Sequence, residues 1–361
     1  MIIKSLELAD FRNYETLDIS FDKGTNILYG DNAQGKTNIL EAIYVSATTK
    51  SHKGSKDKEI VNFNKEEAHI RTYLEKEDEE IRVDMHLRKN KSKGIAIDGQ
   101  KIKKAAELLG LLNVVFFSPE DLGIIKNGPS ERRRFADMEL CQLDNFYLYN
   151  LNSYNKIINQ RNNLLKDMYF NPGLRETLNI WDSQLVSFGS KIIERRIQFA
   201  VQMSEIIYDI HKKLSGGKEE LVIKYEPDVS IDDFERLMNL NQERDIKLKQ
   251  TTTGPHRDDF SFIVNGIDIR KYGSQGQQRT AALSLKLAEI ELVKKISKDT
   301  PVLLLDDVLS ELDSNRQNYL LNSIGDIQTI ITCTGLDEFI NNRFEINKIF
   351  KVTDGSVVCE N

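Results

Sequence analysis

The stretch that decides the fold is Gly30-Asp31-Asn32-Ala33-Gln34-Gly35-Lys36-Thr37. It fits G-x-x-x-x-G-K-[ST], the phosphate loop in which backbone N–H groups form a nest for anions. An apolar run at 25–29 precedes the loop and a helical pattern at 36–46 follows it, which is the order that the motif requires. Chance would produce the motif in a chain of this length on the order of once in a hundred times. The sequence therefore predicts a nucleotide site, with Lys36 facing the β and γ phosphates and Thr37 as a ligand of Mg²⁺.

A second stretch near the other end of the chain fits the same site: Val302-Leu303-Leu304-Leu305-Asp306-Asp307. A short apolar run that ends in carboxylates is typical of a buried strand that brings an aspartate to a metal ion. We expect Asp306 to hold the Mg²⁺ and Asp307 to orient or deprotonate an attacking water. The alternative is a pair of solvated acids at a strand end. Taken together, the two motifs predict one site assembled from both ends of the chain, with another segment inserted between them.

Composition sets limits on the class of protein. The 361 residues are 40% hydrophobic and 29% charged, which is ordinary for a soluble globular protein. No run approaches the ~20 apolar residues of a membrane span, and residues 1–7 alternate like a strand and lack a signal-peptide pattern. Cys141, Cys333 and Cys359 are scattered, so we expect reduced thiols in a cytoplasmic protein, with no disulfide framework or zinc site.

Charge is unevenly distributed along the chain. The net charge of −6 argues against a basic nucleic-acid coat. Acidic residues gather at 66–80, basic residues at 88–104, and a further basic cluster is Arg132-Arg133-Arg134. Such runs are often only solvated surface, and that alternative stays open. Because salt confines the field of a surface charge to ~8–10 Å, a local basic face can still bind phosphates.

Periodicity divides the rest of the chain into strand-rich ends and a helical middle. Strand and turn signals occur at 2–11, 17–21, 68–74, 81–87, Asp98-Gly99, Asn265-Gly266 and 329–332. Residues 144–213 have helical spacing, interrupted at Asn171-Pro172-Gly173 and ended at Ser215-Gly216-Gly217. This predicts a short antiparallel helical hairpin, whose first arm of ~25 residues would span ~36 Å. Both ordinary core packing and a protruding lever remain possible for it.

A third motif opens an expected helix at 277–295: Tyr272-Gly273-Ser274-Gln275-Gly276-Gln277-Gln278-Arg279. A helix N-terminus with a hydroxyl and a flexible backbone suits a γ-phosphate. The motif resembles the L-S-G-G-Q signature of ABC ATPases at Ser274, Gly276 and Gln277 and departs from it at Gly273 and Gln275. Ser310-Glu311-Leu312-Asp313 resembles the D-loop of the same proteins. The resemblance implies an ABC-type ATPase head, in which the signature of one protomer closes on the phosphate loop of another and two ATP molecules lie between them.

Within that superfamily the chain resembles the RecF family of bacterial recombination mediators. The segments that carry this resemblance are Phe11-Arg12-Asn13-Tyr14, Gly30–Asn38, Phe117-Ser118-Pro119-Glu120-Asp121-Leu122, Arg132-Arg133-Arg134, Thr253-Gly254-Pro255-His256-Arg257-Asp258-Asp259, Gly273–Arg279 and Asp306-Asp307-Val308-Leu309-Ser310-Glu311-Leu312-Asp313. Together they cover the whole length of the chain. A chance match over so many separate segments is not credible.

The resemblance implies roles for individual residues. The implied catalytic residues are Asp307, Lys36 and Ser274, and the implied metal ligands are Thr37 and Asp306. The implied nucleotide-binding set is Arg12, Asn13, Gly30, Asp31, Asn32, Ala33, Gln34, Gly35, Lys36, Thr37, Asn38, Ser274, Gly276, Gln277 and Asp313. Arg12 and Asn13 would lie near the base or the α-phosphate. Asp307 stands where many ABC ATPases have a longer Glu, which suggests slow hydrolysis.

The sequence does not decide the functional role of several further positions. The switch His of most ABC ATPases cannot be placed near Cys333-Thr334-Gly335. Glu120 lies roughly where transporters have a Q-loop Gln, and it is a candidate contact to magnesium or its water. His256-Arg257 is either a DNA or interdomain contact or merely a capped turn before a strand.

The expected fold is α/β: an ABC-type ATPase head from residues 1–125 and 245–361, and a mostly helical domain with the hairpin inserted at 126–244. The implied function is an ATP-dependent clamp of recombinational repair, a weak DNA-stimulated ATPase that dimerises on DNA at gaps or single-strand/double-strand junctions. With RecO and RecR it would help load RecA, without reading DNA sequence and without a membrane partner. The alternatives are the nucleotide-binding subunit of an ABC transporter and an SMC-like structural chromosome protein.

Overall fold

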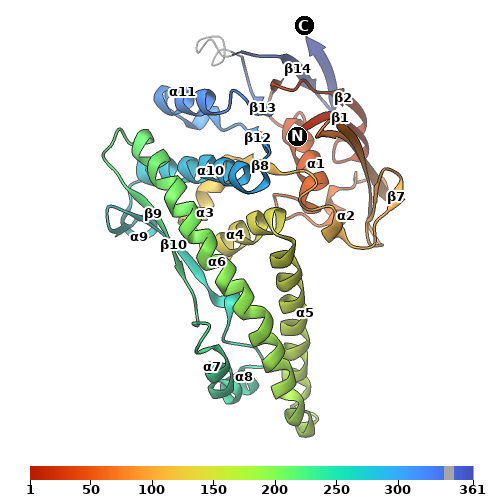
Figure 1. Cartoon of the computed structure of the whole chain (residues 1–361). Coiled ribbons are helices and arrows are strands. Elements are labelled where there is room, and N and C mark those ends of the chain that lie inside the picture. The colour runs from red at the N-terminus through yellow and green to blue at the C-terminus, as the bar shows by residue number, and fades with distance from the viewer. Residues whose placement is uncertain (337–344, 361) are drawn as a thin grey trace. The chain divides into compact units, whose positions relative to one another are not determined.

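The structure is a computed structural model that describes residues 1–336 and 345–360 (Figure 1). The chain forms two units, which we describe separately. Unit 1 comprises Met1–Asp121 and Glu289–Asn361, and unit 2 comprises Leu122–Ala288. The first division lies close to the boundary expected near residue 125, whereas residues 245–288 belong to unit 2 rather than to the segment that contains the C-terminus.

A mostly parallel sheet carries both phosphate-site motifs in unit 1. Its strand order is β15-β14-β3-β13-β12-β8 in the described part of the unit. The bounds are β3 Thr25–Tyr29, β8 Val114–Phe117, β12 Val302–Asp306, β13 Thr329–Cys333, β14 Lys348–Thr353 and β15 Ser356–Glu360. The central strands are apolar and almost fully buried, as expected for parallel strands covered on both faces. Parallel pairing of β13 with both β3 and β12 brings the two ends of the chain together at one edge of the sheet.

A second sheet of unit 1 is antiparallel, with the strand order β2-β1-β4-β5-β6-β7. Its strands are β1 Ile2–Phe11, β2 Tyr14–Ser20, β4 Glu67–Lys76, β5 Glu79–Arg88, β6 Gly94–Ile97 and β7 Gln100–Lys101. Burial alternates along β4, so one face meets the core and the other faces solvent. The predicted hairpin is confirmed, with Ala68 opposite Leu87 and Leu74 opposite Ile81. The Asp98-Gly99 turn between β6 and β7 is confirmed as well.

Helix α1 (Lys36–Thr48) follows the phosphate loop and is buried on nearly all sides. It contacts β4 of the antiparallel sheet and β8, β12 and β13 of the parallel sheet. A helix packed between two sheets needs apolar residues all round, and Ile39, Leu40 and Ile43 supply part of that surface. The other α-helices in the described part of unit 1 are α2 Asp57–Ile60, α11 Ser314–Ser323 and the end of α10 (Gln275–Ser297).

The buried amide of Gln328 ties the start of β1 to the segment before β13. Its Oε1 accepts from the backbone N–H of Ile3 at 2.6 Å, and its Nε2 donates to the carbonyls of Ile3 at 2.7 Å and Asp22 at 2.8 Å. These bonds satisfy backbone groups that would otherwise be unpaired at the end of the sheet.

Unit 2 is largely helical, as predicted. Its helices are α3 Leu122–Lys126, α4 Pro129–Leu143, α5 Asn145–Asp167, α6 Leu178–Leu214, α7 Phe234–Leu240, α8 Gln242–Leu248, α9 Ile269–Tyr272 and most of α10. A three-stranded sheet has the order β11-β10-β9, with β9 Leu221–Glu226, β10 Asp259–Val264 and β11 Ile267–Asp268. Helices α5 and α6 pack against each other and form the predicted hairpin, separated by the 3₁₀ helix Pro172–Thr177 (Figure 1). Asp144 caps α5 by accepting from the backbone N–H groups of Phe146 and Tyr147.

Two buried arginines hold the interior of unit 2 together. Arg196 donates to Asp258 at 2.8 Å, to Asp137 at 2.8 Å and to the Pro255 carbonyl at 2.7 Å. Arg161 donates to Asp182 at 2.6 Å and to Asp245 at 2.7 Å. No helix among the described residues has the length and apolar character needed to cross a bilayer.

Candidate nucleotide-binding site

Two glycines fix the path of the phosphate loop between β3 and α1. Gly30 and Gly35 have φ values of 149° and 114°, where an L side chain is strained. Space is restricted too, because a Cβ on Gly30 would lie 2.3 Å from the carbonyl oxygen of Val352. A Cβ on Gly35 would lie 2.7 Å from the hydroxyl oxygen of Tyr14. Both positions therefore require glycine for a local reason, in agreement with the motif.

Lys36 lies across the mouth of this loop. Its ammonium donates to the carbonyl of Gly30 at 2.5 Å and to that of Asp31 at 2.7 Å. Burial lowers the pKa of Lys36, and the nearby carboxylates of Asp307 and Asp306 oppose that shift. The cation is held over the loop by backbone oxygens, which a phosphate could replace as its partner.

The two ends of the chain meet at Asp306. Thr37 donates its hydroxyl to Asp306 Oδ1 at 2.8 Å, and Thr332 donates its hydroxyl to the same oxygen at 2.8 Å. The backbone N–H of Asp307 donates to Thr332 Oγ1 at 3.0 Å. Thr37 and Asp306 are thus adjacent, and both offer the hard oxygen ligands that Mg²⁺ prefers. Thr332 was missed in the sequence, although its place at the end of an apolar strand was a signal that it could neighbour Asp306.

Asp307 follows directly and faces Lys36. Burial raises the pKa of Asp307, the Lys36 ammonium lowers it, and the Asp306 carboxylate raises it. Its φ of 53° is in the left-handed region, a strained conformation for a non-glycine residue that is often found at functional sites. A carboxylate poised in this way is a reasonable proton acceptor.

A cavity of ≈ 200 Å³ lies beside these groups. It is lined by Asn32, Ala33, Gly35, Lys36, Thr37, Asn38, Lys53, Asp306, Asp307 and Thr332. Most of these residues come from the two motifs that the sequence predicted. Lys53 adds a second cation to the cavity, and no motif pointed to it.

Arg12 contacts α1, and Asn13 contacts both the phosphate loop and α1. Arg12 makes a two-point ion pair with Glu41 of α1, with both distances 2.8 Å. Although burial opposes the shift, the hydrogen bonds from Arg12 and Ser51 lower the pKa of the fully buried Glu41. Asn13 donates to the carbonyl of Gln34 at 3.1 Å and accepts from Asn38 at 2.7 Å. Asn13 therefore braces the loop directly, and a contact from either residue to nucleotide stays a prediction.

Tyr14 presents an unsatisfied polar atom beside the loop. Its buried hydroxyl has no hydrogen-bond partner in the described part of the chain. Burial raises the pKa of Tyr14, so the hydroxyl keeps its proton and remains a donor. A nest of backbone N–H groups, a lysine and a Thr–Asp oxygen pair together fit a nucleoside triphosphate with its magnesium.

The signature residues are placed in unit 2, at the start of α10. Ser274 Oγ accepts from the backbone N–H of Gln277 at 3.2 Å, and Gln277 Oε1 accepts from the backbone N–H of Ser274 at 2.9 Å. This reciprocal arrangement is a capping box. Ser274 and Gly276 are exposed, so the helix N-terminus is accessible. In unit 1, Asp313 is also exposed and caps α11 by accepting from the backbone N–H of Arg316 at 3.0 Å.

Two residues that the sequence offered as candidate contacts have partners within unit 2. Arg132 is only 2% exposed and forms a two-point pair with Asp259, at 2.7 and 2.9 Å. Arg132 therefore belongs neither to a phosphate-binding face nor to solvated surface, the two alternatives left open for its cluster, because its guanidinium is buried and already paired. His256 bonds to the hydroxyl of Tyr154 at 2.7 Å and to the carbonyl of Thr251 at 3.1 Å. Glu120, in contrast, is exposed in a short 3₁₀ helix at Pro119–Asp121.

The fold and the loop geometry together define an α/β head of the ABC/SMC type, with an inserted helical region. Residues 2–357 match the family described as RecF/RecN/SMC N terminal domain. The chain is 66% identical over 359 residues to the DNA replication and repair protein RecF of Agathobacter rectalis, and the match covers 99% of each chain. The chain belongs to the RecF family. It is also 65% identical over 363 residues to RecF of Lachnospira eligens, with 100% of each covered.

A solved structure agrees with this assignment. The structure described as the recombination mediator protein RecF with ATP in the RecFOR pathway has a TM-score of 0.93 and 36% sequence identity to this chain. The match covers 99% of this chain and 97% of the other. The RecF resemblance expected from the sequence is confirmed, and the transporter alternative falls away.

Proposed function

We propose that this protein binds ATP with Mg²⁺ at the phosphate loop and acts as an ATP-dependent DNA clamp in recombinational repair. The observation that carries the proposal is the cavity in which Lys36, the Thr37–Asp306 pair and Asp307 meet. Solved RecF relatives are described with ATP and as members of the RecFOR pathway. Binding to RecO and RecR, and assistance to RecA loading, are inferred from family membership alone.

Four residues of the cavity have defined tasks in this proposal. Lys36 exchanges its carbonyl partners Gly30 and Asp31 for phosphate oxygens, a stronger charge-assisted contact. Thr37 and Asp306 would hold the Mg²⁺, which when bound neutralises charge on the β and γ phosphates. Asp307 accepts a proton from the attacking water. Its short side chain reaches less far than a glutamate, which is consistent with slow hydrolysis and with a clamp rather than a motor.

The second face of the nucleotide would come from another protomer. Ser274 and Gly276 are exposed at the N-terminus of a long helix, where the helix dipole favours an anion. We propose that they close on the γ-phosphate bound by a partner's phosphate loop. ATP then acts as the bridge of a head-to-tail homodimer, and hydrolysis releases it.

A mixing experiment tests this arrangement. Lys36→Met disables the loop of a protomer, and Ser274→Arg blocks its signature with a bulky side chain. Each variant alone should stay monomeric with ATP in light-scattering chromatography. When mixed, they should form a heterodimer, because one of its two sites takes its loop from the Ser274→Arg chain and its signature from the Lys36→Met chain. One intact site in place of two should give an intermediate dimer yield.

The ATP affinity of the monomer distinguishes the Lys36→Met variant from the Ser274→Arg variant. Lys36→Met removes a charge-assisted contact worth ~1.5–3 kcal/mol, so the ATP affinity of the monomer should fall about tenfold to a hundredfold. Ser274→Arg should leave that affinity near normal, because the loop of its own chain is untouched. Loss of ATP binding in the Ser274→Arg monomer would mean that Ser274 acts on its own chain's nucleotide and would rule out the head-to-tail model. Unchanged dimerisation of Lys36→Met alone would rule out the composite site.

A further inference from the structure

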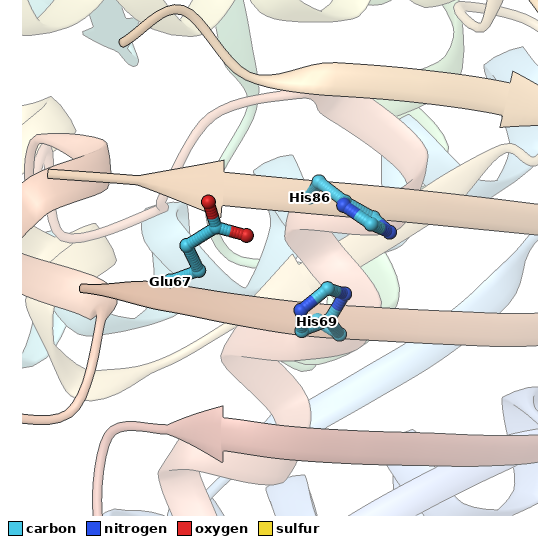
Figure 2. A group of neighbouring side chains, drawn as sticks. All are labelled: Glu67, His69 and His86. Atoms are coloured by element: carbon cyan, nitrogen blue, oxygen red, sulfur yellow. The ribbon is translucent and has the colours of Figure 1, made fainter. Parts of the chain in front are cut away.

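Three side chains that commonly ligate metals gather on the solvent-facing side of the antiparallel sheet in unit 1. Glu67 and His69 come from β4, and His86 comes from β5 (Figure 2). One ligand atom from each residue lies within 4.8 Å of the others. The cluster has no part in the nucleotide site, and none of the motifs found in the sequence includes it.

Strand register places the three together. His69 and His86 are directly opposite each other in the β4–β5 pair, and their ring centroids are 4.0 Å apart. Glu67 precedes His69 by two positions and therefore points to the same face of the sheet. Because side chains opposite each other across two strands have Cβ atoms ~4.5–5.5 Å apart, the backbone already provides the spacing of the two imidazoles.

The cluster has room for an ion. The strand neighbours of the two histidines are small: Ala9 pairs with His69 and Gly94 pairs with His86. Within 4 Å, and over the described residues, a Cβ built on Gly94 would meet only the Cβ of His86, at 3.8 Å, so Gly94 leaves space beside His86. Over the described residues, neither imidazole makes a hydrogen bond or an ion pair within the protein. Their ring nitrogens are therefore available to a ligand.

Charges of both signs surround the cluster: the carboxylates of Glu67 and Asp84 and the guanidinium of Arg88. Burial lowers the pKa of His86, and His69 and Arg88 lower it further, against the carboxylates of Glu67 and Asp84. Arg88 Nε forms an ion pair with Glu67 Oε1 at 3.4 Å.

We propose that Glu67, His69 and His86 form a binding site for a divalent transition-metal ion of the zinc type. Imidazole and carboxylate ligands suit such ions, and three protein ligands leave a further position for water. A tetrahedral ion with bonds of ~2.1 Å needs ligand atoms roughly 3.4 Å apart, which small side-chain rotations can reach from the present spacing. The ion clamps β4 to β5 across the sheet. The site contains no cysteine, which is why the cysteine pattern gave no sign of it.

The test is a titration of the metal-free, full-length protein with Zn²⁺ in the absence of nucleotide and Mg²⁺. Wild type should bind one Zn²⁺ per chain at this site by calorimetry. Mutation of a residue that only hydrogen-bonds to a metal ligand typically lowers metal affinity 10–100-fold. His69 and His86 are ligands themselves in this proposal, so His69→Gln and His86→Gln should each lower Zn²⁺ affinity by about tenfold or more. Glu67→Gln should weaken binding in the same direction. Glu7→Gln is the matched control, since Glu7 is 38% exposed and paired with Arg71 at 3.0 Å on the same sheet, and it should bind Zn²⁺ like wild type.

A second measurement distinguishes loss of the metal site from misfolding of a variant. Co²⁺ in place of Zn²⁺ should give visible d–d absorption bands in wild type and Glu7→Gln, and these bands should disappear in His86→Gln. Far-UV circular dichroism and the metal-free melting temperature should match wild type, because the substitutions lie on the solvent face. If a histidine variant does not fold, the Glu67→Gln titration decides. Absence of Zn²⁺ binding to wild type, or binding of equal strength in all three variants, would overturn the proposal.

Discussion

The phosphate loop of unit 1 and the arginine clusters inside unit 2 both concentrate charged side chains, but they leave them in different states. At the loop, Lys36 and Asp307 face a cavity of ≈ 200 Å³, and Lys36 donates its hydrogen bonds in the described part of the chain to backbone carbonyls. In unit 2, Arg161 and Arg196 are buried and bound to carboxylates of their own chain. The first arrangement has unused capacity for a ligand, whereas the second uses its charges to stabilise the fold.

This contrast explains why charged motifs are ambiguous in a sequence. Arg132-Arg133-Arg134 and His256-Arg257-Asp258-Asp259 are as rich in charge as the phosphate loop. Yet Arg132 pairs with Asp259, and Asp258 accepts from Arg196 at 2.8 Å and from the backbone N–H of Asp228 at 2.9 Å. A buried charged side chain that is already paired inside the fold, as Arg132 is with Asp259, does not indicate a ligand site.

The largest effect should come from breaking a buried arginine cluster. Arg161→Leu leaves Asp182 and Asp245 buried without their cation. Removal of one partner from a buried ion pair costs ~3–5 kcal/mol, so the free energy of unfolding should fall by about that amount in urea denaturation. Arg175→Leu is the control, because Arg175 pairs with Glu243 at the surface of the same unit, where an ion pair contributes ~0–1 kcal/mol. Equal effects from the two variants would contradict the contrast between buried and exposed pairs.

Acid should weaken unit 2 through His256. Burial, opposed by the hydrogen bond with Thr251, lowers the pKa of His256 to about 4, and Arg257, Arg133 and Arg196 lower it further. In the unfolded chain the imidazole takes up its proton near its ordinary pKa of 6.5. The free energy of unfolding should therefore fall as the pH drops from 6.5 towards 4, by up to about 3 kcal/mol from this group.

Comparison with a variant isolates this contribution from that of the carboxylates, which also titrate in acid. Urea midpoints measured across the same pH range should decline less steeply for His256→Gln than for wild type. If the urea midpoints of wild type and His256→Gln declined in parallel with pH, His256 would have an ordinary pKa in the folded protein. The turn at Pro255–Arg257 would then be open to solvent.

A smaller effect, on the rate of ATP hydrolysis rather than on stability, is expected at the cavity beside the phosphate loop. Asp307→Asn keeps the shape of the side chain and removes the proton acceptor, so ATP hydrolysis should slow by roughly 10²-fold. ATP binding and ATP-dependent dimers should persist, which fluorescence titration and light scattering would check. An unchanged rate would exclude Asp307 as the base and direct attention to Asp306 and Asp313.

The sequence could predict the nucleotide site because its parts are local motifs with a fixed structural meaning. The glycine loop, the Asp-Asp strand end and the 144–213 hairpin all rest on spacing, and the structure contains each of them. Thr332 and Lys53 were missed because their roles depend on parallel strand pairing and on the packing of a loop. The burial and pairing of Arg132 could not be predicted, because its partner Asp259 is far away in the sequence and is brought to it only by folding.

The smallest effect concerns exposed charge in unit 1. Lys101, Lys103 and Lys104 are exposed, and we expect them to contact DNA phosphates without reading bases. Each phosphate contact to duplex DNA contributes ~0.9 to the slope of log K against log salt, so replacing all three by Ala should reduce that slope by up to about 2.7. The loss should be similar for unrelated duplexes of equal length, and ATP binding by the monomer should be intact. The control triple is Lys156, Lys166 and Lys213 to Ala, which removes the same charge from exposed positions of α5 and α6. An equal change in both triples would mean that only net charge matters, and no change in the first would leave the exposed Arg134 as the next basic residue to test.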